Sequence, residues 1–140
     1  MIVCGIEIKS FEAIIAIISC DLASGTVSRI ESAKKVSLNN DEDCADVRST
    51  YSAFESLLRA NGVTRVAVKK RAHKGKFAGG AISFKIEGLI QMQNVSPVTF
   101  VSGQALSAAE RREPYKVPSG FVQYQNEAAK TAIYVARGCQ

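Results

Sequence analysis

MIVCGIEIK at residues 1–9 and EAIIAIISCD at residues 12–21 are two runs rich in β-branched residues, joined by a few residues around Ser10. Runs of this length and composition are typical of buried strands, and the short connection predicts a hairpin. After an SGT turn, the mixed run VSRIESAKKVSL predicts a half-exposed edge strand with a bulge near Ala33. We therefore expect the chain to begin with three strands.

The clearest helical pattern lies in NNDEDCADVRSTYSAFESLLRANG, residues 39–62. Apolar residues recur there at spacings of three and four, which places them on one face of a helix. They are Cys44, Val47, Tyr51, Phe54 and Leu58. Asn39 or Asn40 is the expected N-cap, the acidic residues 41–43 suit the positive end of the helix dipole, and Gly62 suits the C-terminal stop.

Strands and helices alternate in the rest of the chain. We expect a strand at 64–69, a helix at 81–93, a strand at 96–102, and helices at 103–112 and 120–136. Two strand–helix–strand crossovers imply parallel pairing of the later strands. The order strand–strand–strand–helix–strand–helix–strand–helix therefore predicts an α/β fold with a five-stranded mixed sheet and helices on both faces.

Length and composition indicate one ordinary domain over residues 1–140, because 46% of residues are hydrophobic and 22% are charged. No apolar run is long enough to cross a bilayer and no secretory signal begins the chain, so we expect a cytoplasmic protein without a membrane partner. The four cysteines form no C-x-x-C pair and His73 is the only histidine, so we expect no transition-metal site.

Positive charge is concentrated in one part of the chain, whose formal net charge is +5. No acidic residue occurs from Ser56 to Ile86, whereas lysine and arginine are frequent there. The cations are Arg59, Arg65, Lys69, Lys70, Arg71, Lys74, Lys76 and Lys85. Such a stretch attracts phosphates, acidic partners or nucleic acid, and the alternative is a solvated loop that aids solubility.

The segment after the strand at 64–69 is the candidate anion-binding site. A helix N-terminus exposes unpaired backbone N–H groups, and glycines let an anion approach them closely. The expected binding residues are Lys70, Arg71, His73, Lys74, Lys76, Gly79 and Gly80. In open α/β sheets, ligands collect beyond the carboxyl ends of the parallel strands, which here means near 7–9, 69–71 and 101–102. The alternative is an ordinary glycine-containing connection.

The element order, with CGIEIK in the first strand, VAVK in the fourth and NEAAKTAIYVA in the last helix, resembles the ribonuclease-H-like superfamily. Within it, the chain is similar to RuvC-type Holliday-junction resolvases and their YqgF relatives. It also resembles an uncharacterised bacterial domain-of-unknown-function family assigned to this fold. The resemblance covers the whole chain and implies a ribonuclease-H-like domain.

The resemblance also implies where a metal site would lie. The resolvases carry an aspartate where this chain has Glu7, a glutamate at the end of the fourth strand where it has Lys69, and two aspartates in the last helix where it has Glu127 and Lys130. Those carboxylates hold two Mg²⁺ ions, which ammonium groups would repel. The resemblance thus implies a degenerate site, without a resident metal, that binds phosphate-bearing ligands such as DNA or RNA without cleaving them.

Two alternatives stay open. The chain is a nuclease that uses Glu7 and Glu127 with Mg²⁺ or Mn²⁺, or it is a protein-interaction or regulatory module. The sequence also leaves a homo-oligomer open. Because a buried carboxylate without a partner is costly, we expect Glu7 to lie within roughly 4 Å of the ammonium group of Lys69 or Lys130.

Overall fold

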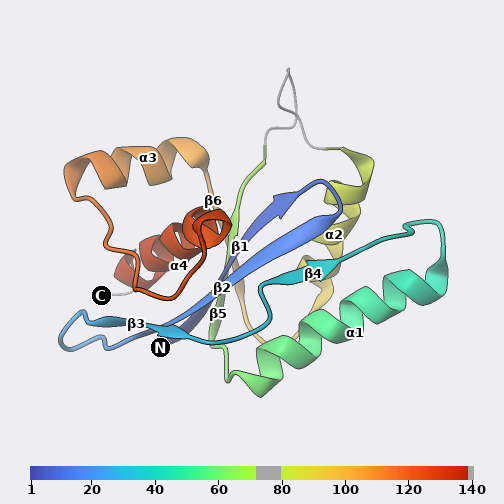
Figure 1. Cartoon of the computed structure of the whole chain (residues 1–140), viewed down its shortest axis with the longest axis horizontal. Coiled ribbons are helices and arrows are strands. Elements are labelled where there is room, and N and C mark those ends of the chain that lie inside the picture. Colours follow the sequence, from blue (N-terminus) through green and yellow to red (C-terminus); the bar gives the residue numbers. More distant parts are fainter. Residues whose placement is uncertain (72–79, 139–140) are drawn as a thin grey trace.

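The computed structural model describes residues 1–71 and 80–138, in which helices cover both faces of a central sheet (Figure 1). The elements in chain order are β1 (Ile2–Lys9), β2 (Glu12–Cys20), β3 (Val27–Ile30), β4 (Lys35–Ser37), α1 (Cys44–Ala60), β5 (Arg65–Lys69), α2 (Ala81–Met92), β6 (Val98–Val101), α3 (Gly103–Arg112), the 3-10 helix η1 (Gln123–Gln125) and α4 (Asn126–Gly138). No helix within the described part is long and apolar enough to span a membrane.

The sheet is mixed, as the crossovers predict. Its strand order is β3–β2–β1–β5–β6, and β4 also pairs with β2. The β1–β2 hairpin is antiparallel, whereas β5 pairs in parallel with both β1 and β6. Because β1 and β5 run in the same direction, their carboxyl ends meet at one edge of the sheet.

The number of strands differs from the expectation of five, since the described residues form a six-stranded sheet. The run expected to be one bulged edge strand is two strands, β3 and β4, which pair with opposite ends of β2. Between the paired positions, residues 31–34 lie opposite only residues 15 and 16 of β2. A bulge accommodates one extra residue, and two extra residues interrupt the ladder.

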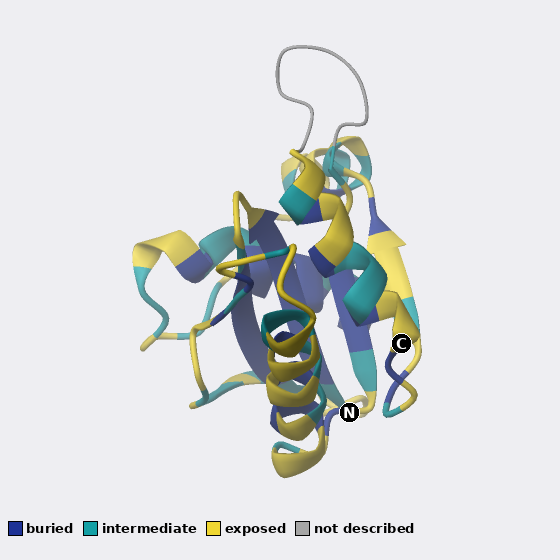
Figure 2. Cartoon of the chain, turned by 90° about the vertical axis from the view of Figure 1, so that its right-hand side faces the viewer, coloured by how far each residue is buried: buried dark blue, intermediate teal, exposed yellow. Residues whose placement is uncertain are grey.

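The helices α1 and α2 cover one face of the sheet. Alternate residues of β1, β2 and β5 pack there against apolar residues of both helices, among them Phe54, Leu58, Ile86 and Ile90. The opposite side of α1 is exposed (Figure 2). The predicted N-cap was wrong: Asp43 caps α1 by accepting a 2.9 Å hydrogen bond from the backbone N–H of Ala45, and the helix begins after the asparagines.

The helix α4 lies on the other face, above a row of very small residues. Gly5 of β1 lies between Ala16 of β2 and Ala67 of β5 in the ladder. A Cβ atom at Gly5 would collide with the carbonyl oxygen of Ala128 and would lie 2.9 Å from the Cβ of Ala132. The absence of a side chain at Gly5 therefore lets the first turns of α4 contact the sheet directly.

Candidate functional site

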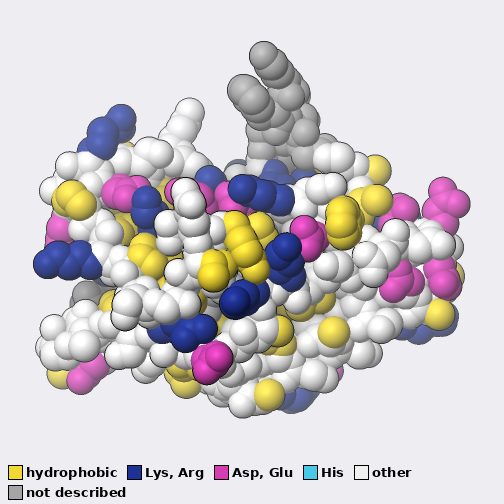
Figure 3. All heavy atoms as spheres, in the orientation of Figure 1, with side chains coloured by type: hydrophobic (Ala, Val, Ile, Leu, Met, Phe, Trp, Pro, Cys, Tyr) yellow, Lys and Arg dark blue, Asp and Glu magenta, His cyan; other side chains and the backbone are white. Residues whose placement is uncertain are grey.

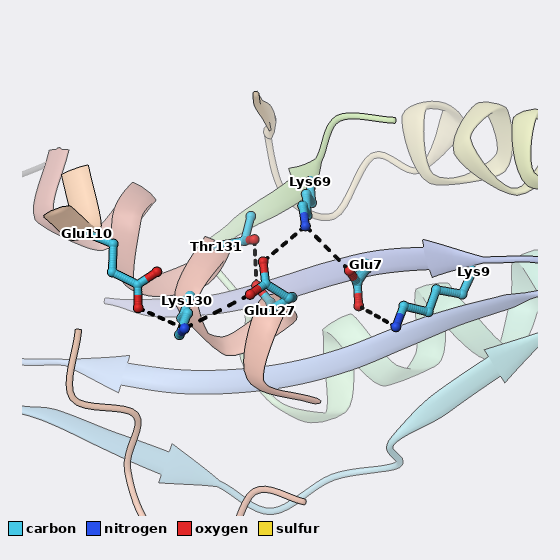
Figure 4. Close-up of polar contacts among 7 residues, drawn as sticks. All are labelled: Glu7, Lys9, Lys69, Glu110, Glu127, Lys130 and Thr131. Atoms are coloured by element: carbon cyan, nitrogen blue, oxygen red, sulfur yellow. Dashed lines mark hydrogen bonds and ion pairs between the residues drawn. The ribbon is translucent and has the colours of Figure 1, made fainter. Parts of the chain in front are cut away.

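Glu7 and Lys69 lie side by side at the sheet edge where β1 and β5 end. Their strands pair in parallel with Ile6 opposite Val68, so the next residue of each strand points toward α4. Lys69 Nζ lies 3.6 Å from Glu7 Oε2 and 3.0 Å from Glu127 Oε2 (Figure 4). The expected ion pair between Glu7 and a lysine is confirmed, with Lys69 as the lysine.

Two opposing effects act on the pKa of Lys69. Partial burial of its ammonium group favours the neutral form and would lower the pKa. The hydrogen bond to Glu127 and the negative charges of Glu127 and Glu7 favour the charged form, and together they raise the pKa above its usual value. Lys69 is therefore a cation throughout the physiological pH range and is unsuited to act as a general base.

Further residues extend this arrangement into a row of alternating charges (Figure 4). Lys130 Nζ lies 2.7 Å from Glu110 Oε1 on α3 and 4.0 Å from Glu127 Oε1, and Lys9 Nζ lies 3.6 Å from Glu7 Oε1. We call the set Lys9, Glu7, Lys69, Glu127, Lys130 and Glu110 the charged network. It contains three cations and three anions. Each of these charges lies within 4.0 Å of at least one opposite charge.

Sequence reasoning missed two members of the network. Lys9 lies two residues beyond Glu7 in β1, so strand alternation placed it on the same face and could have found it. Glu110 had no comparable signal, because its contact with Lys130 depends on how α3 returns alongside α4.

The side chains in the charged network do not fit a divalent metal ion. Mg²⁺ requires a near-octahedral set of oxygen ligands, and paired sites need a cluster of carboxylates. Here the ammonium group of Lys69 lies between the carboxylates of Glu7 and Glu127, where it competes directly with a bound cation. Within residues 1–71 and 80–138, no three histidine, cysteine, aspartate or glutamate side chains gather as a metal site would need.

The residues predicted to bind anions are only partly within the described ranges. His73, Lys74, Lys76 and Gly79 lie outside them. Lys70 is exposed directly beyond β5, and Gly80 is the N-cap of α2, with no side-chain cap.

Arg71 is placed differently from an exposed loop cation. Its Nη2 lies 3.2 Å from Glu87 Oε2, its guanidinium group lies 3.9 Å from the ring centroid of Phe84, and only 9% of its side chain is exposed. Both partners belong to α2. Arg71 thus joins the end of β5 to α2, and it is less accessible to a ligand than Lys70.

Residues 1–135 match a protein family described as "Protein of unknown function (DUF3010)". The chain belongs to this family. Among curated proteins, none matches the DUF3010 chain in sequence.

Solved structures show the fold of this DUF3010 chain. The RuvC of Thermus thermophilus in complex with a Holliday junction substrate matches with a TM-score of 0.71 and 12% identity, over 99% of this chain and 96% of that one. The same organism's RuvC alone gives a TM-score of 0.68 and 13% identity, over 99% and 97%. The Fowlpox virus resolvase with Holliday junction DNA gives 0.57 and 14%, over 99% of both chains. The fold is ribonuclease-H-like.

Proposed function

We propose that this chain binds nucleic acid through its phosphates at the edge where β1 and β5 end, and that it does not cleave the strand by metal-dependent hydrolysis. One observation carries this proposal. The Lys69 ammonium lies 3.6 and 3.0 Å from the carboxylates of Glu7 and Glu127, where the resemblance to the resolvases implies a metal-binding carboxylate.

Two exposed cations, Lys9 within the charged network and Lys70 next to it, support the binding half of the proposal. The side chain of Lys9 is 61% exposed, and Lys70 is exposed immediately after β5. Lys9 is the last residue of β1 and Lys70 follows β5, so both lie at the carboxyl ends of neighbouring parallel strands, where ligands of open α/β sheets collect. Two of the similar solved structures contain Holliday junction DNA, which makes branched DNA the first ligand to test.

A binding titration over a range of salt concentrations tests this half directly. Fluorescence anisotropy with labelled single-stranded, duplex and four-way-junction DNA, and with RNA, should show binding that weakens steeply as salt increases. Replacing Lys9 and Lys70 with alanine should weaken binding and reduce the salt slope by about one unit for each phosphate that the variant no longer neutralises. The matched control is Arg48→Ala, an exposed cation of α1 on the opposite face, which should bind as the wild type does. Unchanged affinity in the Lys9/Lys70 variant would refute the location.

A cleavage assay on the same substrates tests whether the chain lacks metal-dependent nuclease activity. One observation favours the nuclease alternative. Glu7 Oε1 is buried and accepts no hydrogen bond from a described residue; its ion pair with Lys9 spans 3.6 Å, so a metal ion could replace Lys9 there. We expect no cleavage of any substrate with Mg²⁺ or Mn²⁺. Cleavage that requires Mn²⁺ and is abolished by Glu7→Gln would replace this proposal with a nuclease.

A further inference from the structure

A small pocket lies next to the charged network. It has a volume of about 470 Å³ and is lined by Lys9, Gln123 and Tyr124. Lys9 connects it to the network, because its Nζ lies 3.6 Å from Glu7 Oε1. It is a shallow depression that is open to solvent, not an enclosed cavity.

Tyr124 is an exposed aromatic residue on a rigid support. The residue is 39% exposed, whereas the next residue, Gln125, is buried. The amide of Gln125 donates a 2.8 Å hydrogen bond to the carbonyl of Ile15 in β2 and accepts a 3.0 Å hydrogen bond from the backbone N–H of Val122. These bonds fix η1 against the sheet, so the ring of Tyr124 is held in place without being packed into the core.

A cation lies over one face of the ring as well. Lys35 Nζ of β4 is 4.8 Å from the ring centroid of Tyr124, and it is held there by Glu12 Oε2 at 3.4 Å. Apolar and basic side chains lie side by side near the middle of the face that carries β4 and the start of α4 (Figure 3). An aromatic surface between lysines is the combination that binds single-stranded nucleic acid, because bases stack on the ring while phosphates contact the cations.

We infer that Tyr124 is a stacking platform for an unpaired nucleobase on the ring face that Lys35 does not cover, with Lys9 and Lys35 as contacts for the flanking phosphates. The inference rests on the proposed function and specifies its ligand class as nucleic acid that offers an unpaired base, such as a single strand or an open branch point. The amide of Gln123 can both donate and accept hydrogen bonds at the edge of the base. A fully paired duplex keeps its bases stacked on each other and offers nothing to the ring.

Anisotropy titrations with three DNA probes test this inference. The probes are a duplex with a short single-stranded gap, the same duplex with abasic sites across the gap, and a continuous duplex. Tyr124→Ala should weaken binding to the gapped probe about tenfold, in the range found when one base–aromatic stack is removed. It should leave binding to the abasic and continuous probes unchanged, and Tyr124→Phe should bind all three as the wild type does. Tyr51→Ala, on α1 across the sheet, is the matched control and should also bind as the wild type does.

A second measurement does not depend on any variant. A single 2-aminopurine in the gap should lose fluorescence when the wild-type protein binds, because stacking on Tyr124 quenches it. If the wild type binds the gapped probe but 2-aminopurine is not quenched, or Tyr124→Ala binds it as tightly as the wild type, the inference fails and the proposed function stands. If the wild type binds no probe at any salt concentration, the proposed function fails and the inference fails with it.

Discussion

Replacing Lys69 with glutamate and Lys130 with aspartate should turn the charged network into a site for Mn²⁺. Lys69 Nζ lies 3.6 Å from Glu7 Oε2 and 3.0 Å from Glu127 Oε2, so a carboxylate at position 69 would face both existing carboxylates. Lys130 Nζ lies 4.0 Å from Glu127 Oε1, which places a fourth carboxylate on the same helix turn. Oxygen-rich clusters of this kind are the ligands that Mg²⁺ and Mn²⁺ prefer.

The expected magnitude follows from the charges that change. Two unit charges 4 Å apart interact by about 1 kcal/mol in water and about 4 kcal/mol near a protein surface. The double variant converts attractive pairs into repulsive ones, so without metal its free energy of unfolding should fall by about 2–4 kcal/mol. An ion at a hundred times its dissociation constant returns about 2.7 kcal/mol. For a chain of this size, that recovery corresponds to a rise in Tm of roughly 10 °C.

Thermal unfolding and isothermal calorimetry with increasing MnCl₂ measure this directly. The matched control is Lys69→Gln with Lys130→Asn, which removes the same two cations without adding carboxylates. It should show neither a Tm increase nor a binding heat. A folded Lys69→Glu, Lys130→Asp variant that does not respond to Mn²⁺ would refute the assignment of these positions, although the ribonuclease-H-like fold would be unaffected.

Three further outcomes concern stability. Gly5→Ala should lower the free energy of unfolding by about 3 kcal/mol or more, because the added Cβ would collide with the backbone of Ala128. Gly88→Ala is the control, because a Cβ at this position of α2 meets no other atom, and it should raise the free energy of unfolding by about 0.5–1 kcal/mol. Urea titrations measure both changes. The pKa of Lys69 is raised on folding, so its ion pairs stabilise the protein fully below the unfolded pKa of about 10.4, and this contribution is lost as the pH rises through the folded value. Unfolding curves of the wild type and Lys69→Met should therefore converge in that alkaline range, and a constant gap would contradict the ion-pair explanation. Arg71→Ala should cost about 2 kcal/mol, because it leaves a largely buried carboxylate of α2 without its partner; an unchanged urea midpoint would contradict this structural role.

The strands and helices could be predicted from the sequence because local patterns specify them. The hairpin around Ser10 and the crossovers on either side of β5 follow from strand composition and helical periodicity, and strand–helix–strand crossovers then imply parallel pairing. The division of residues 27–38 into β3 and β4 could not be predicted, because it depends on how many residues of β2 lie opposite the break.

Some residues of the candidate site could be predicted from the sequence and others could not. Glu7, Lys69 and Glu127 were identified through the resemblance to the resolvases, and the structure places Lys69 within ion-pair distance of both carboxylates. The position of Arg71 against α2 was not predictable, since lysines and arginines in a basic run look alike until their tertiary partners are known. Tyr124 was not identified either, because its exposure depends on how η1 is held against the sheet.

The contact between α4 and the sheet explains how the charged network is brought together. Gly5, between two alanines of the neighbouring strands, sets how closely α4 approaches the sheet, and this determines how near residues 127 and 130 lie to residues 7 and 69. The backbone therefore brings four side chains to one sheet edge whatever their chemistry. Carboxylates at all four positions would repel one another and need bound cations, whereas two lysines among two glutamates neutralise the cluster from within. Under the proposed function, exposed lysines at the ends of the same strands attract phosphates, so ligand binding at this edge would not depend on the chemistry of cleavage.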